Sequence, residues 1–290
     1  MIKISESQGV DIYAYEQGFF SFTNSPYFAH KKALAIDIYP PRGNKEALSP
    51  VEGKIILIKP ISSGMDYVTI IEPTGKENIC VKILHVKPSL KVGESIKPGD
   101  FFGKIVWSPF YNFWTDYHLH IEVRPASDPL RASGGFEIDM TPIIKRMISS
   151  YTQRKKNNNL TFKVKSVKEN YVLLNGTFIQ THYSSPFMVK RGDFIGCLDG
   201  GIPHYGHGAL IGEGGLPNNE RLTIFGIRTY LDYYTDNYIH FSYEKRRILV
   251  NGEIYRGMSF YINDECLKLI PLKLGKTNLN EGEEVIIRPY

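Results

Sequence analysis

Short apolar runs broken by turn-forming residues are the feature that most limits the fold of this 290-residue chain. Most of the runs are too short for a helix, and many alternate apolar with polar side chains, as strands with one buried face do. Glycine, proline, asparagine and aspartate separate them. We therefore expect a mainly β protein with strands at 35–39, 53–58, 67–72, 79–85, 102–106 and 118–124, and at 160–167, 171–174, 222–229, 238–243, 247–250 and 285–288.

One segment has helical rather than strand periodicity, because apolar residues recur at helix spacing within residues 141–151. The polar run that follows, residues 154–159, has the composition of a linker. The chain is also long enough for two domains. We therefore predict a first domain over residues 1–150 and a second β-rich domain over residues 160–290.

Two Asn-Gly pairs, Asn175-Gly176 and Asn251-Gly252, predict tight hairpin turns, because both residue types tolerate a positive φ. The glycine-rich segment 200–208 is interpreted as a loop rich in turns that carries His204 and His207 incidentally. His182 and His240 belong to no motif and are interpreted as structural residues.

Residues 97–104 and 190–197 resemble each other, and both combine a turn with the start of a strand. The second domain is either a degenerate repeat of the first, or the two segments converged by chance, since repeats of this length carry little information.

The overall composition excludes several classes of protein. The chain is 42% hydrophobic and 22% charged, its net charge is only +5, and the charges of both signs are interleaved, so we expect no nucleic-acid partner. A signal-peptide core and an apolar stretch of about 18 residues are both missing, so we expect a cytoplasmic protein with no membrane partner. Cys80, Cys197 and Cys266 lie far apart, which predicts buried, reduced thiols rather than disulfides.

The segment His118-Leu119-His120 is the first candidate for chemistry. In a strand, alternation puts both imidazoles on one face and Leu119, Ile121 and Val123 on the other. Two histidines on one polar face can share a metal, or divide into a ligand and a proton-transfer group. They can equally be polar strand residues with a structural role.

Three further residues extend this candidate. Asp37 interrupts the apolar run 35–39, and a buried carboxylate there needs a partner. His30 precedes it, and His85 ends a later expected strand. One aspartate with two histidines is a common catalytic zinc set, because three protein ligands leave a fourth position open.

The order of these motifs along residues 20–125 resembles the lysostaphin-type (LytM) zinc endopeptidases. That family is similar in having a histidine and an aspartate near the start, a P-x-x-G-x-V strand, a Y-x-H-L strand, a pair of glycine turns and a closing H-L-H-F-E-V strand. The matching segments here are His30 with Asp37, then 49–55, 83–86, 90–100 and 118–123.

The resemblance implies a duplicated hybrid motif: an antiparallel, sandwich-like or barrel-like β domain, followed here by a second β-rich domain. Carried over residue by residue, it implies that His30, Asp37 and His120 ligate zinc, while His85 and His118 manage protons and the oxyanion beside the substrate. The implied cofactor is zinc. The implied partner is an extended, usually glycine-rich, peptide substrate.

Three features depart from the family pattern. Near His85, Ile83 replaces the family's tyrosine and Val86 replaces its leucine. His30 and Asp37 are seven residues apart, farther than in the family, and an odd spacing would put them on opposite faces of one regular strand. A turn through residues 31–34 must therefore redirect His30. The aromatic segment 107–116 replaces the usual glycine-rich loop, and it either lines a ligand-binding wall or packs as core.

Three functions stay open. The first is a zinc-dependent endopeptidase-like hydrolase. The second is a catalytically inactive binding or scaffold protein with the same hybrid β-fold. The third is a carrier domain, since residues 49–53 and 92–100 also look like biotinyl or lipoyl domains, but the lysine expected in the hairpin turn is missing. Whether His30 reaches the metal separates the first two, and residues 160–290 resemble no family that we identify.

Overall fold

The computed structural model is mainly β and built from antiparallel strands, as expected. It describes residues 1–150, 162–176, 188–215, 223–244 and 247–290. Contacts divide the chain into two compact units: Met1–Phe22 with Tyr27–Ile143, and Thr23–Pro26 with Ile144–Tyr290. The expected linker at 154–159 and His182 lie outside the described residues.

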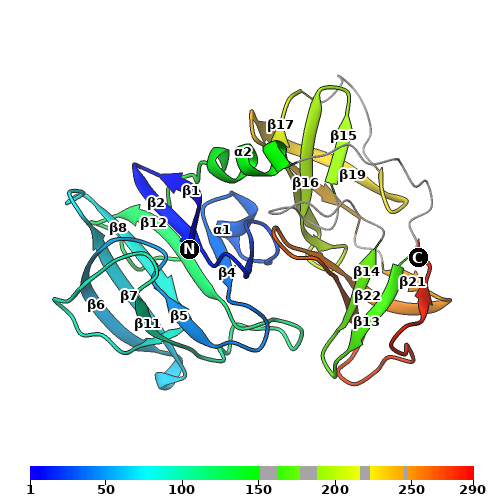
Figure 1. Ribbon diagram of the computed structural model, residues 1–290, viewed down its shortest axis with the longest axis horizontal. Coiled ribbons are helices and arrows are strands. Elements are labelled where there is room, and N and C mark those ends of the chain that lie inside the picture. The colour runs from blue at the N-terminus through cyan, green and yellow to red at the C-terminus, as the bar shows by residue number, and fades with distance from the viewer. Residues whose placement is uncertain (151–161, 177–187, 216–222, 245–246) are drawn as a thin grey trace. The chain divides into compact units, whose positions relative to one another are not determined.

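The first unit is organised around one main sheet with the strand order β10-β6-β7-β8-β12-β4-β3 (Figure 1). Smaller sheets join β1 to β2, and β5 and β9 to β11. The elements are β1 (Ile2–Ser7), β2 (Val10–Ala14), β3 (Phe19–Ser21), α1 (Phe28–Lys31), β4 (Ile36–Tyr39), β5 (Glu46–Leu48), β6 (Gly53–Ile61), η1 (Ser62–Gly64), β7 (Asp66–Pro73), β8 (Ile79–Leu84), β9 (Val86–Pro88), β10 (Ser95–Ile96), β11 (Phe101–Ile105) and β12 (Leu119–Pro125).

Side-chain alternation gives strand β12 an apolar face and a polar face. Leu119, Ile121 and Val123 of β12 are fully buried, as predicted from their spacing. His120 and Glu122 alternate with them and therefore lie on the opposite face of the strand. One face of β12 therefore contributes to the core of this unit, and the other carries polar side chains of the candidate site.

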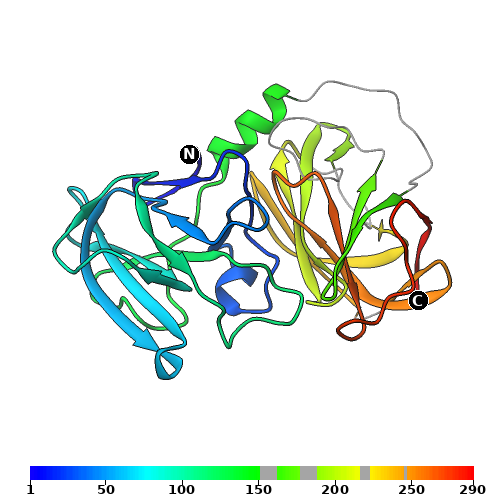
Figure 2. The same cartoon turned by 60° about the horizontal axis from the view of Figure 1, so that its bottom comes forward.

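The second unit contains one large antiparallel sheet, which bends along its length (Figure 2). The longer segment of this unit, Ile144–Tyr290, begins within α2 (Thr141–Ser150). This helix lies where a helix was predicted. The strands are β13 (Phe162–Val167), β14 (Val172–Gly176), β15 (Met188–Arg191), β16 (Phe194–Ile202), β17 (His207–Glu213), β18 (Thr223–Ile224), β19 (Ile227–Thr235), β20 (Tyr238–Tyr243), β21 (Ile248–Val250), β22 (Glu253–Phe260), β23 (Leu267–Pro271), β24 (Glu284–Val285) and β25 (Ile287–Pro289).

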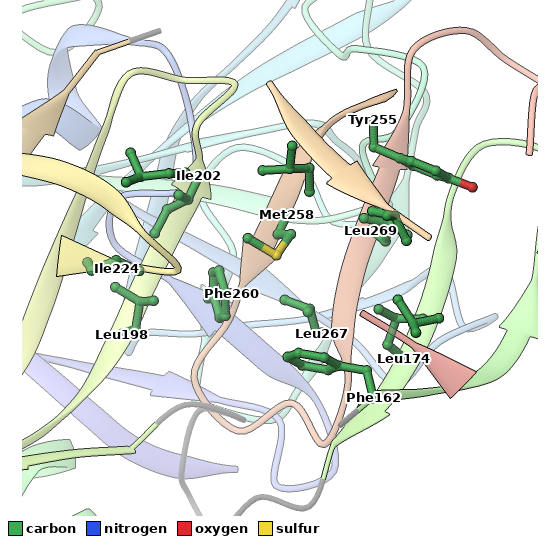
Figure 3. Packing of buried hydrophobic residues seen from close by; sticks show 14 of the residues in the cluster. Phe162, Leu174, Leu198, Ile202, Ile224, Tyr255, Met258, Phe260, Leu267 and Leu269 are labelled. Atoms are coloured by element: carbon green, nitrogen blue, oxygen red, sulfur yellow. The ribbon is translucent and has the colours of Figure 1, made fainter. Parts of the chain in front are cut away.

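The core of the second unit lies inside this bend. Side chains from β13, β14, β16, β22 and β23 point toward one another, with Met258 and Phe260 among them (Figure 3). Phe162, Leu198 and Leu267 are each at most 2% exposed. Complete burial of such side chains stabilises the unit by roughly 1.5–3 kcal/mol each.

The prediction of a loop over residues 200–208 is wrong for both ends of this segment, because they lie in strands. Gly200 and Gly201 belong to β16, and His207 and Gly208 begin β17, so only the turn between them is irregular. The glycines serve a close approach of the two strands. A Cβ added to Gly200 would lie 2.9 Å from the Cα of its partner Gly208, too close for two side chains.

Of the two turns predicted at Asn-Gly pairs, one is confirmed and one is wrong. Asn251 and Gly252 both have positive φ and join β21 to β22 in the predicted hairpin. Asn175-Gly176 is instead paired within β14, so that turn prediction is wrong. The single strand expected at 222–229 is also wrong, because Phe225 and Gly226 adopt positive φ and split it into the hairpin β18-β19.

The two similar segments share their local structure. Gly99 and Gly192 both have positive φ, and β11 and β16 begin soon after them. Their pairing differs, because β11 lies between β5 and β9, whereas β16 pairs with β15, β17 and β22. The duplication therefore stays a prediction.

The three cysteines are free and buried. In the part of the chain that the structure describes, neither α1 nor α2 has the length and apolar character that crossing a membrane requires.

Candidate metal centre

Three elements bring the predicted metal ligands together on the polar face of the main sheet. Asp37 of β4 and His120 of β12 are paired residues of adjacent antiparallel strands, so their side chains share a face. His30 lies on the short helix α1 rather than in a strand, and it is 1% exposed. The turn after α1 therefore removes the difficulty of the odd spacing between His30 and Asp37.

The candidate ligand atoms form a compact triangle. His120 Nδ1 lies 2.9 Å and His30 Nε2 lies 3.2 Å from Asp37 Oδ1, and the two nitrogens are 3.1 Å apart. Tetrahedral zinc with bonds of about 2.0–2.1 Å holds its ligand atoms roughly 3.3–3.4 Å from one another. The three side chains thus match a zinc site after shifts of a few tenths of an ångström. Within the described residues they form the one group of three such donors.

In His30 and His120, the ring nitrogen that points away from Asp37 forms a hydrogen bond to an acceptor. His30 Nδ1 lies 2.8 Å from the carbonyl of Phe22, and because a carbonyl only accepts, this nitrogen carries the hydrogen. His120 Nε2 likewise donates to Glu122 Oε1 at 3.1 Å. Partners of this kind set the tautomer and orientation of metal-binding histidines. They direct the lone pairs of His30 Nε2 and His120 Nδ1 toward the Asp37 carboxylate.

Three electron-rich atoms at this separation need a cation among them. Burial alone would raise the pKa of Asp37, but the neighbouring His30, His118 and His120 hold it well below the usual range. Burial alone would lower the pKa of His120, but hydrogen bonds to Asp37 and Glu122 raise it to about 9. The site therefore favours a positive charge, either a proton on His120 or a metal ion.

Buried charged side chains contact Glu122, the hydrogen-bond partner of His120. Lys82 Nζ donates to Glu122 Oε1 at 2.8 Å, and Arg124 Nη1 donates to Glu122 Oε2 at 2.5 Å. Burial would raise the pKa of Glu122, but His120 and Lys82 lower it to about 2. Glu122 is therefore an anion, able only to accept the hydrogen of His120 Nε2.

The two predicted catalytic histidines lie beside this triangle. His118 Nδ1 donates to the carbonyl of Asp116 at 2.9 Å, which leaves His118 Nε2 3.5 Å from Asp37 Oδ1. The ring centroids of His85 and His118 are 5.1 Å apart, and those of His85 and His120 are 6.1 Å apart. Burial is the main cause that lowers the pKa of both, in the case of His118 to about 4.

The aromatic segment 107–116 covers part of the site. The ring of Tyr111 stacks on His118 with centroids 4.7 Å apart and meets His85 edge-on. Trp114 is buried, whereas Trp107 and Phe110 are each 46% exposed. One end of the segment therefore packs as core and the other leaves aromatic side chains exposed, and the ligand-binding role considered from the sequence stays a prediction.

Sequence reasoning missed the residues that orient the histidines. Asp66, which is fully buried, accepts a hydrogen bond from His85 Nδ1, and Glu122 does the same for His120. Asp66 stands just before an expected strand, and Glu122 reads as a polar strand residue. Neither position signals its role, because the partner of each is fixed only by folding.

Two models of one family match the chain. The model described as "Domain of unknown function (DUF8155) N-terminal domain" matches residues 9–140, and the model of the C-terminal domain matches residues 156–288. No curated protein matches the chain.

Two solved structures are similar to the chain at low identity. Lysostaphin, the antimicrobial peptidase from Staphylococcus simulans, is 13% identical with a TM-score of 0.34, over 81% of this chain and 91% of that one. The solution structure of lysostaphin is 15% identical with a TM-score of 0.30, over 73% of this chain and 80% of that one. Since the two domain models together match more than half of its length, the chain belongs to the two-domain DUF8155 family.

Proposed function

We propose that this protein is a zinc-dependent hydrolase that cleaves an extended peptide. His30, Asp37 and His120 are the metal ligands, and His85 and His118 are the catalytic histidines. We place the activity in residues 1–150 and assign residues 160–290 to a second β-rich domain with a separate role. The observation that carries the proposal is the convergence of two imidazole lone pairs on one buried carboxylate oxygen.

The donor set suits zinc better than other common ions. Two neutral imidazoles with one carboxylate and no thiolate match catalytic zinc sites, whereas calcium and magnesium prefer all-oxygen ligands. Three protein ligands also leave a coordination position open. When bound, zinc supplies Lewis acidity toward a carbonyl group and makes water a stronger acid.

The protein's own groups supply the proton transfer. His118 donates through Nδ1 to Asp116, and His85 donates through Nδ1 to Asp66, so the Nε2 atom of each ring is the one left to accept a proton. Both rings are buried, which favours their neutral form at neutral pH. A neutral imidazole with a fixed tautomer can act as a general base and then as a general acid. The peptide nature of the substrate rests on the motif resemblance over residues 20–125.

A second candidate function is a non-catalytic binding or scaffold protein, and burial favours it. The five site residues are between 1% and 8% exposed, and Tyr111 lies against both candidate catalytic histidines. A peptide substrate would need access to these buried side chains, whereas a protein that holds the cation purely for stability would not.

Cleavage of glycine-rich reporter peptides separates the two candidates. The zinc-loaded parent protein is compared with His118→Ala and with a matched control outside the site, Tyr230→Ala, whose side chain is 44% exposed. The hydrolase proposal expects cleavage by the parent and the control and a strong loss in His118→Ala. Zinc binding without cleavage of any reporter favours the scaffold function.

A further inference from the structure

The backbone of His85 departs from a regular strand. Leu84 is paired with His120 and shares its face, so continued alternation would turn His85 to the opposite, apolar face. His85 instead adopts φ of 70°, in the left-handed region that non-glycine residues seldom occupy. Hydrogen bonds from His85 N to the Tyr67 carbonyl and from Val106 N to the His85 carbonyl hold this conformation.

Backbone conformations of this kind cost of order 1–3 kcal/mol and persist where the surroundings impose them, often at functional sites. Here the conformation redirects the imidazole of His85 toward His118 and His120. The fold thus maintains an unfavourable backbone conformation in order to place this ring.

A buried carboxylate receives the redirected ring. Asp66 is fully buried, and its Oδ2 accepts from His85 Nδ1 at 2.7 Å and from Ser108 Oγ at 2.6 Å. The backbone N–H of Tyr67 donates to Oδ1 at 2.7 Å. Burial would raise the pKa of Asp66, but these hydrogen bonds, first that of His85, lower it below its ordinary value. With three donors directed at it, the carboxylate has little freedom to rotate.

His85 and His118 differ in the partner of Nδ1. His118 donates to a backbone carbonyl, which is neutral, whereas His85 donates to an anionic carboxylate. A carboxylate both fixes the tautomer and stabilises the imidazolium that forms when Nε2 accepts a proton. The stronger partner therefore belongs to His85, and Ser108, also fully buried, holds that partner in place.

We propose that Asp66, held by Ser108, is a positioning residue that keeps His85 in the Nδ1–H tautomer with Nε2 available toward the candidate metal centre. The tautomer does not depend on the metal. Its use in catalysis rests on the proposed function.

Nitrogen-15 NMR of the histidine side chains in the full-length protein tests the tautomer without any substrate. In the parent at neutral pH we expect His85 to be a single Nδ1–H tautomer, with its resonances assigned by their loss in His85→Gln. Asp66→Asn can donate from its amide, so we expect the Nε2–H form to become populated while His118 stays unchanged. A parent His85 in the Nε2–H form, or in a mixture, overturns the proposal even if Asp66→Asn fails to fold.

Kinetics test the catalytic use of this pair. With a reporter peptide that the parent cleaves, Asp66→Asn should retain zinc and KM but lose kcat, within the roughly 10² to 10⁴-fold worth of a positioned acid or base. Ser108→Ala should show a smaller loss of kcat than Asp66→Asn, because Asp66 keeps its hydrogen bond to His85. An altered tautomer with unchanged kcat overturns the positioning role. A parent that cleaves no reporter counts against the proposed function, whereas the tautomer result stands independently.

Discussion

Each of the two units buries a group of histidines, but the ring nitrogens of the two groups make different contacts. In the second unit, His207 Nε2 lies 2.8 Å from the Ser25 carbonyl, His207 Nδ1 lies 3.4 Å from His240 Nε2, and His240 Nδ1 lies 2.9 Å from Asp232 Oδ2. These contacts form a chain that uses both nitrogens of each ring. In the first unit, inner nitrogens converge on a single oxygen of Asp37.

The difference teaches which buried histidines can share a metal ion. Histidines in a chain turn each ring nitrogen toward a separate partner, so no three donor atoms meet at one point. Convergent histidines leave several lone pairs directed at one point, where they repel unless a proton or a metal lies between them. The arrangement of ring nitrogens, rather than the number of histidines, therefore distinguishes the candidate metal centre from the histidine chain of the second unit.

The largest effect is expected from removing a convergent ligand. His120→Ala should lose stable zinc binding and with it all activity, because two protein ligands are too few for a stable catalytic site. His240→Ala, in the chain of the second unit, should keep its zinc. Zinc content after dialysis measures both. Loss of zinc from His240→Ala and retention in His120→Ala would reverse the comparison.

Within the first unit, His118→Ala should keep zinc and lower the cleavage rate by roughly 10² to 10⁴-fold, the usual worth of a positioned acid or base. Its Nε2 is 3.5 Å from Asp37 Oδ1 and outside the triangle. Zinc content and steady-state kinetics on the same preparations separate the two effects. If His118→Ala loses zinc while His120→Ala retains it, the assigned roles are exchanged.

The zinc-depleted protein should lose stability as the pH rises. The pKa of His120 is raised from its ordinary value of 6.5 to about 9, so its contribution is fully present below pH 6.5 and is lost as the pH rises through 9. The expected loss is on the order of 3 kcal/mol. Urea unfolding between pH 6.5 and 9.5 measures it, with depleted His120→Gln as the control. Zinc should abolish the loss, and an equal slope in the control would show that other groups cause it.

A smaller effect is expected from replacing Glu122, which accepts the hydrogen bond from His120 Nε2. Glu122→Gln keeps the size of the side chain but removes the charge that accepts from His120 Nε2, so zinc affinity should fall about 10 to 100-fold. Isothermal titration with zinc gives the affinity. Glu52→Gln, an exposed position in the same unit, is the control. An unchanged affinity in Glu122→Gln would mean that zinc binding does not depend on the charge that accepts from His120 Nε2.

Much of the first unit could be predicted because its signals are local. Strand alternation was enough to place His120 and Leu119 on opposite faces, and the isolated polar residue in an apolar run identified Asp37 as a buried carboxylate in need of a partner. Both inferences need only the neighbours of each residue along the chain. His30 reaches Asp37 through a turn. The odd spacing of the two residues showed that a turn was needed, but it did not show the conformation of that turn.

The rest depends on contacts between distant residues. The role of Asp66 arises from the left-handed backbone of His85, which no residue preference favours. Strands β16 and β17 were not recognised, because Gly200 and Gly208 indicate a turn when read alone and a close strand pair only when they face each other. Pairing of this kind becomes visible only after the chain has folded.

Zinc stoichiometry measured on the parent and on Asp37→Asn tests the central claim most directly. Asp37 Oδ1 is the atom on which both histidines converge, and the asparagine keeps the size of the side chain without its charge. We predict one zinc per chain in the parent, by elemental analysis after zinc is offered and excess is removed, and much less in Asp37→Asn. A parent that takes up no zinc, or an Asp37→Asn variant that binds it equally well, would contradict the account.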